Sequence, residues 1–108
     1  MDSGELLRLA TALHGQGRLD KALGVYREVL RLTPNNPDAL KGLGLLAHQQ
    51  GQLPEAVQWY GRAREVRPLD VDLALHGGLA LQEMGEAGRA ETWFRAAVEL
   101  APGDADAL

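Results

Sequence analysis

The sequence predicts an all-α fold, a right-handed α-solenoid of three helix–turn–helix units with six main helices. The first observation is a period of 34 residues that runs through the whole 108-residue chain without an insertion. This step separates Pro34, Pro68 and Pro102; Gly17, Gly51 and Gly85; Ala22, Ala56 and Ala90; and Tyr26, Tyr60 and Phe94. The second observation is that apolar residues between these markers follow a helical spacing. A fixed period of this size indicates stacked supersecondary units.

The first unit reads as two helices, over residues 3–15 and 20–32. Leu6, Leu9, Ala10 and Leu13 lie at i, i+3, i+4 and i+7, which places them on one helical face. Gly17 lies where the first helix must end and the chain must turn. Asp20 is a plausible N-cap for the second helix, because a short acceptor side chain can bind the free N–H groups of the first turn.

Prolines mark the boundaries between the units. Pro34 cannot continue a helix, Asn36 can cap the next one, and Pro37 fits its first turn. We expect helices over residues 38–50 and 54–66, then, after an N-cap at Asp70, over 71–84 and 87–100. The chain is thus expected to be a single domain over 1–108. Its repeats span about 3–36, 37–70 and 71–104, with 105–108 as the start of a truncated fourth, so we expect a fragment of a longer protein.

Composition narrows the function classes. The net charge of −4 and the pI near 5.3 argue against nucleic acid as a partner, since nucleic-acid-binding domains present a basic face. No stretch reaches the length needed for membrane insertion, and no secretory signal is visible, so we expect a cytoplasmic protein. The chain has no cysteine, which excludes disulfides and thiolate metal sites. We expect neither a cofactor nor a metal, and no enzymatic activity.

With repeats starting at Ser3, Pro37 and Val71, the pattern resembles the tetratricopeptide repeat, a helix–turn–helix unit of 34 residues. The resemblance rests on a small residue at repeat position 8, alanine at position 20, an aromatic ring at position 24 and proline at position 32. The residues at these positions are Ala10, Gly44 and Gly78; Ala22, Ala56 and Ala90; Tyr26, Tyr60 and Phe94; and Pro34, Pro68 and Pro102. The resemblance covers nearly the whole chain and implies a superhelix whose first helices line a concave groove.

The resemblance also implies which residues face the groove, and we expect a protein or peptide segment to bind there. The candidate groove residues are Leu7, Thr11, His14, Lys41, Leu45, His48, Leu75, Leu79 and Gln82. Four of them are leucines, which predicts an apolar stripe for the anchors of a ligand, and Lys41 would pair with an acidic group of that ligand. The alternative is that some of these leucines pack sideways into the core.

Two other site types are not favoured by these residues. A subset of the family grips the C-terminal carboxylate of chaperones with lysine, arginine and asparagine, but the matching positions hold Leu7, Thr11, Gly42, Asp72 and His76. A carboxylate ligand would be repelled by Asp72. His14 and His48 occupy equal positions in adjacent units, and two imidazoles without further ligands are a weak zinc signal.

Two departures from the repeat pattern stand out. Gly77 and Gly78 lie within a predicted helix, where each glycine costs about 1 kcal/mol relative to alanine. That helix should therefore be the weakest of the six. The readings are a kink, a close approach by another backbone, a functional hinge, or simple tolerance of sequence drift in a well-packed stack, and the last is favoured. At the other end of the unit, Trp93, Phe94, Ala97 and Val98 form an apolar edge that predicts self-association, although tryptophans at this repeat position more often pack into the core.

We therefore expect a non-enzymatic scaffold. Two alternatives stay open at this point. The first is a targeting or regulatory module of a larger enzyme, such as a glycosyl- or sulfotransferase. The second is a structural module that forms a homo-oligomer through the edge at Trp93 and Phe94.

Overall fold

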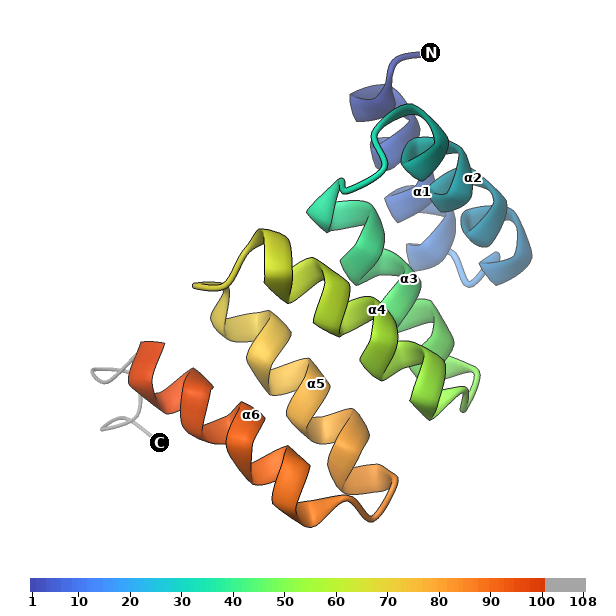
Figure 1. The fold of residues 1–108 in the computed structure, drawn as a ribbon. Coiled ribbons are helices and arrows are strands. Elements are labelled where there is room, and N and C mark those ends of the chain that lie inside the picture. Colours follow the sequence, from blue (N-terminus) through green and yellow to red (C-terminus); the bar gives the residue numbers. More distant parts are fainter. Residues whose placement is uncertain (101–108) are drawn as a thin grey trace.

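The computed structural model describes residues 1–100, which form six helices arranged as three antiparallel hairpins (Figure 1). The helices are α1 (Ser3–Gly15), α2 (Leu19–Leu32), α3 (Pro37–Gln49), α4 (Leu53–Val66), α5 (Val71–Glu83) and α6 (Ala87–Leu100). The all-helical prediction and the pairing into helix–turn–helix units are confirmed. The predicted start of a fourth unit, at 105–108, lies outside the described residues.

Each hairpin turns at the predicted glycine. The φ angles of Gly17, Gly51 and Gly85 are +75°, +75° and +81°, a left-handed conformation that costs glycine little. In each turn, the residue that follows this glycine donates its N–H to a carbonyl of the preceding helix, for example Arg18 to Leu13 at 2.9 Å. The glycine period in the sequence therefore reports a repeated backbone conformation.

The caps are only partly as predicted. Asn36 accepts from the N–H groups of Asp38 and Ala39, both at 3.1 Å, and Asp70 accepts from Leu73 at 3.2 Å. The prediction for Asp20 was wrong. The N-cap of α2 is Arg18, which makes no side-chain cap, and Asp20 lies within the first turn, where its charge favours the positive end of the helix dipole.

The core consists of two clusters joined by shared residues. One cluster is formed by α1, α2 and α3 around Tyr26 and Leu43, and the other is formed by α3, α4, α5 and α6 around Leu40 and Tyr60. Leu30 and Trp59 pack against both clusters. The apolar interior is therefore continuous from one hairpin to the next, as stability in a repeat stack requires.

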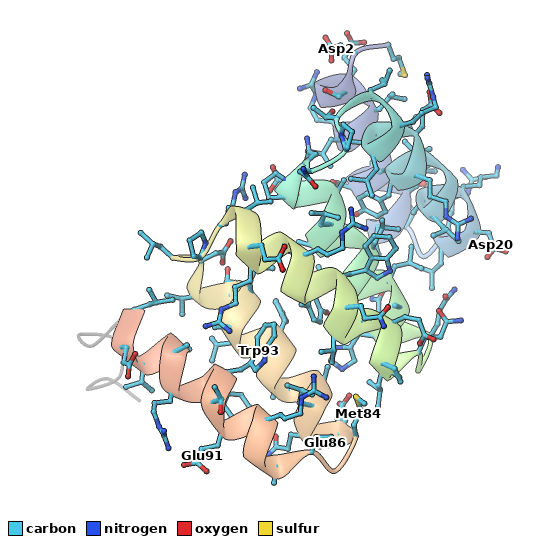
Figure 2. All side chains as sticks on the ribbon, in the orientation of Figure 1. Asp2, Asp20, Met84, Glu86, Glu91 and Trp93 are labelled. Carbon is cyan, nitrogen blue, oxygen red and sulfur yellow. The ribbon has the colours of Figure 1, made fainter. Side chains whose placement is uncertain are left out.

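Glycines in the first helices make room for aromatic rings of the second helices. A Cβ on Gly44 would lie 2.5 Å from Cε1 of Tyr60, and a Cβ on Gly78 would lie 2.6 Å from Cε1 of Phe94. A Cβ on Gly77 would likewise overlap the ring of Trp93, which Figure 2 shows over α5. These distances are shorter than real carbon atoms tolerate, so each ring takes the place of a side chain.

The glycine pair in α5 therefore has a packing role that the sequence analysis did not foresee. The glycine pair does not interrupt α5, which is one helix over Val71–Glu83. The group that closely approaches Gly77 and Gly78 is a pair of aromatic rings and not a second backbone. Whether α5 is the weakest helix stays a prediction.

Candidate peptide-binding groove

A hollow with a volume of about 550 Å³ lies between α1 and α3. Its lining residues are Leu7, Thr11, His14, Gly15, Tyr26, Asp38, Lys41, Gly42, Leu45 and Gln49. Predicted groove residues from two different repeats thus meet in one place, namely Leu7, Thr11 and His14 with Lys41 and Leu45. The first helices of neighbouring units face each other here, since α1 contacts α3 directly.

The remaining groove candidates lie outside this hollow. Leu75 and Leu79 occupy the same repeat positions as Lys41 and Leu45, one unit further along, and are 39% and 44% exposed. Gln82 is exposed and His48 is half-buried. The two exposed leucines on α5 would extend an apolar surface beyond the hollow. Leu7 and Leu45 are partly buried and pack against the two core clusters, so the alternative of packing into the core applies in part to these two.

A chain of hydrogen bonds links the repeats on this side of the molecule. His14 shares one hydrogen bond with the Tyr26 hydroxyl (Nδ1 to oxygen, 3.0 Å) and another with Gln49 of the next repeat (Nε2 to Oε1, 2.5 Å). His48 repeats the arrangement, with Tyr60 at 3.5 Å and Glu83 at 2.6 Å. Burial raises the pKa of the Tyr26 hydroxyl, so this group stays protonated and can donate.

The charged groups of the groove already have partners within the chain. Lys41 Nζ lies 3.7 Å from Asp72 Oδ2, and Arg67 binds both carboxylate oxygens of Asp38 at 2.8 and 3.2 Å. Lys41 was expected to pair with an acidic group of a ligand, but here it faces an acid on α5 instead. A ligand carboxylate would have to compete with Asp72 for this ammonium group.

Five lining residues are not among the nine candidates named above, namely Gly15, Tyr26, Asp38, Gly42 and Gln49. The sequence analysis considered Gly42 only as a position that grips a carboxylate in other members of the family. Tyr26 is only 3% exposed and comes from α2, a helix that was not expected to reach the groove. A Cβ on Gly42 would lie under 3.0 Å from Cε1, Cζ and the hydroxyl oxygen of the Tyr26 ring. One sequence signal could have indicated the space beside Gly42. This residue shares its repeat position with His76 but has no side chain.

The predicted self-association edge on α6 is only partly exposed. Trp93 and Phe94 are half-buried against α5, and the Arg64 guanidinium lies 4.8 Å from the centre of the Trp93 ring. Ala97 is 4% exposed, whereas Val98 is 50% exposed. Most of this predicted edge therefore packs within the third unit, and Val98 is the member that faces solvent.

Residues 1–100 contain no cluster of three or more histidine or acidic side chains placed to hold a metal ion. Within the same residues, no helix combines the length and the apolar character needed to cross a bilayer.

Comparison with protein families decides the classification. One model described as tetratricopeptide repeat matches residues 7–65, and a second with the same description matches residues 75–104. The chain belongs to the tetratricopeptide repeat family. Such modules generally serve as scaffolds for protein–protein interaction and are typically not catalytic.

Solved structures of tetratricopeptide repeat proteins share this fold. A crystal structure of MamA superposes with a TM-score of 0.90 at 21% identity, covering 97% of this chain and 61% of the MamA chain. The Yersinia enterocolitica type III secretion translocator chaperone SycD, in an alternative dimer, gives a TM-score of 0.87 at 23% identity, covering 93% of this chain and 76% of SycD. This chain spans about three-fifths of the MamA chain. No curated protein matches it in sequence.

Proposed function

We propose that this tetratricopeptide repeat module binds an extended or helical segment of another protein along the face formed by α1, α3 and α5. The observation that carries the proposal is the open hollow between α1 and α3, continued by the exposed Leu75 and Leu79 on α5. An apolar surface on a first helix that borders a hollow is typical of an interaction site, because water leaves it at a gain in free energy. SycD, whose fold is similar, is itself described as a chaperone of translocators.

The energy available on this face can be judged from its leucines. Full burial of one leucine side chain contributes about 1.5–3 kcal/mol. Leu75 and Leu79 are already more than half-buried, so each should contribute a fraction of that amount when a ligand covers it. An aspartate in the same place would in addition bring an unpaired charge under the ligand.

The proposal is tested with peptides selected from a displayed random library against the full chain. Their dissociation constants are then measured for the wild type and for Leu75→Asp. We expect affinity to fall at least about tenfold in this variant, which corresponds to roughly 1.4 kcal/mol.

Leu9→Asp is the matched control. Leu9 is 37% exposed and lies on a first helix, as Leu75 does, but it does not line the hollow. Peptides should bind Leu9→Asp as they bind the wild type, provided that circular dichroism shows both variants to be helical. Equal losses in the two variants, or no loss in Leu75→Asp, would place the binding face elsewhere.

A second candidate, self-association, is favoured by one observation, the exposed Val98 on α6. Sedimentation velocity over a range of concentrations tests it. Association that disappears in Val98→Asp would support an interface at this edge, and a wild-type monomer at all concentrations would rule it out.

A further inference from the structure

Two pairs of polar side chains join α3 to α5, and both expose their acidic member. Lys41 lies 3.7 Å from Asp72, and His48 lies 2.6 Å from Glu83. The basic side chains are 24% and 21% exposed, whereas the two carboxylates are 70% and 57% exposed. A carboxylate offers about four lone-pair sites, so one partner leaves room for a second donor. A ligand that approaches this face therefore meets the carboxylates first.

The C-terminal end of α5 adds to this negative character. The last turns of α1 and α3 contain His14 and His48, whereas the matching residue of α5 is Gln82, and the last turn of α5 holds no basic residue. Glu83 therefore lies at the negative end of the helix dipole, where a cation is the favoured group. A further exposed acid, Glu86, lies in the turn that follows α5 (Figure 2).

Two exposed leucines lie between the acids of α5. Asp72, Leu75, Leu79 and Glu83 follow one another at steps of three, four and four residues, which places them on one face of the helix. We call these four residues the α5 stripe. At a rise of 1.5 Å per residue the stripe is about 16 Å long. It presents an acid, two apolar side chains and a second acid in that order.

The spacing of the stripe suits an extended chain. Side chains on one face of an extended chain are about 6.6 Å apart, because every second residue points the same way. The step of four residues from Leu75 to Leu79 is about 6 Å along the helix axis, which is nearly the same. An extended segment that runs along α5 can therefore place successive same-face side chains on successive members of the stripe.

We infer that the α5 stripe binds an extended segment of a partner protein in which two apolar side chains at alternate positions are flanked by lysine or arginine. The apolar side chains cover Leu75 and Leu79, and the flanking bases meet Asp72 and Glu83. Complementary charge of this kind orients a ligand and excludes those of like charge. This inference rests on the proposed function, because it names the chemistry of the segment that the same face binds.

The test uses three heptapeptides, acetylated and amidated at their ends. The first is Lys-Ser-Leu-Ser-Leu-Ser-Lys, and the other two carry glutamine or glutamate in place of both lysines. Amide chemical shifts of the full chain are followed during titration with each peptide. We expect the lysine peptide to shift the amides of Leu75, Leu79 and Glu83. It should bind about two- to thirtyfold more tightly than the glutamine peptide, which is the combined effect of two exposed ion pairs.

Two further comparisons separate charge from other effects. The glutamate peptide should bind more weakly than the glutamine peptide, because its ends meet like charges. The advantage of the lysine peptide should shrink as ionic strength rises to about 1 M, where interactions between exposed charges are screened beyond about 3 Å.

A double variant with a matched control locates the charges. In Asp72→Asn/Glu83→Gln, the lysine and glutamine peptides should bind about equally. Asp20→Asn/Glu91→Gln changes the net charge by the same amount on second helices, α2 and α6, where Figure 2 shows both residues. Glu91 also has a basic partner at 2.6 Å, as Glu83 does. This control should keep the preference for lysine, and circular dichroism should show both variants to be helical.

Several results would overturn the inference. These are no binding of the lysine peptide, equal or tighter binding of the glutamine or glutamate peptide, shifts that cluster away from α5, or a lysine preference that survives in Asp72→Asn/Glu83→Gln. If library peptides lose affinity in Leu75→Asp but the heptapeptides show no preference for lysine, the face binds peptides and the basic partner is wrong. If no library peptide binds the face at all, the proposed function itself fails.

Discussion

Gly77→Ala measures how far the aromatic rings depend on the glycines of α5. In an exposed helix interior, glycine to alanine stabilises by about 1 kcal/mol, because alanine loses less backbone entropy and shields the helix. At Gly77 the new methyl group would overlap Cε3, Cζ3 and Cδ2 of Trp93, a large ring held between α4, α5 and α6. Overpacking of this kind typically costs about 1–3 kcal/mol.

The two effects leave Gly77→Ala neutral to about 2 kcal/mol less stable than the wild type, whereas a glycine without neighbours should show only the gain. Gly24→Ala is that control, because a Cβ there meets nothing within 4 Å. The two variants should therefore differ by about 1–3 kcal/mol in free energy of unfolding. In a domain of this size, each 1 kcal/mol shifts the melting temperature by about 4–8 °C.

Urea and thermal unfolding followed by circular dichroism at the helical band give both quantities. A double-mutant cycle with Trp93→Ala assigns the cost, because Gly77→Ala should become stabilising once the ring is gone. The reasoning would be refuted if Gly77→Ala stabilised the wild type as much as Gly24→Ala does, or if its cost persisted without the Trp93 ring.

Three further predictions concern single side chains. Asn36→Ala removes the N-cap of α3 and should lower the free energy of unfolding, measured with denaturant, by about 1 kcal/mol. A variant as stable as the wild type would show that the cap is dispensable. Tyr26→Phe should lower the free energy of unfolding by about 1 kcal/mol, because it leaves His14 without its 3.0 Å hydrogen-bond partner. Tyr60→Phe should lower it less, because the hydrogen bond between Tyr60 and His48 is 3.5 Å long. The reverse order would contradict the geometry. Burial, assisted by the charge of Lys41, lowers the pKa of His76 below the usual 6.5, so the unfolded chain takes up a proton more readily than the folded chain does. The free energy of unfolding of the wild type should therefore fall relative to that of His76→Phe as the pH falls from 7 through 6.5. Parallel plots of unfolding free energy against pH for the two proteins would contradict this.

The sequence was sufficient for the repeat architecture because each marker residue carries one physical requirement. A glycine with positive φ, an alanine at a helix contact and a proline that ends a unit recur at the same step, and all of them are visible without coordinates. The caps at Asn36 and Asp70 followed from the same local rules. The predicted cap at Asp20 did not form, because the residue at which α2 begins is decided by the conformation of the preceding turn, and α2 already begins at Leu19.

The candidate site was predictable only in its outline. Repeat phase placed Leu7, Thr11 and Lys41 on a shared face, but it treated every repeat as equal. The hollow depends on a difference between repeats, since Gly42 stands where the next unit has His76. Contacts between helices set the direction of the Tyr26 ring and the partner of Lys41, and a pattern read one helix at a time does not contain such contacts.

The two tyrosines rest on different glycines, Tyr26 on Gly42 of the next unit and Tyr60 on Gly44 of its own unit, so these repeats cannot be exchanged freely. A tyrosine that rests on the following unit needs a glycine in the first helix of that unit. A tyrosine that rests on its own unit needs a glycine in the first helix of the same unit. In an array where the third unit directly followed the first, the Tyr26 ring would meet the imidazole of His76. It could not shift toward its own unit, because the methyl group of Ala10 lies where the second unit has Gly44. The small residues beside each tyrosine thus determine which unit can follow which. Engineered arrays made from these units would have to keep each tyrosine next to the unit it packs against now.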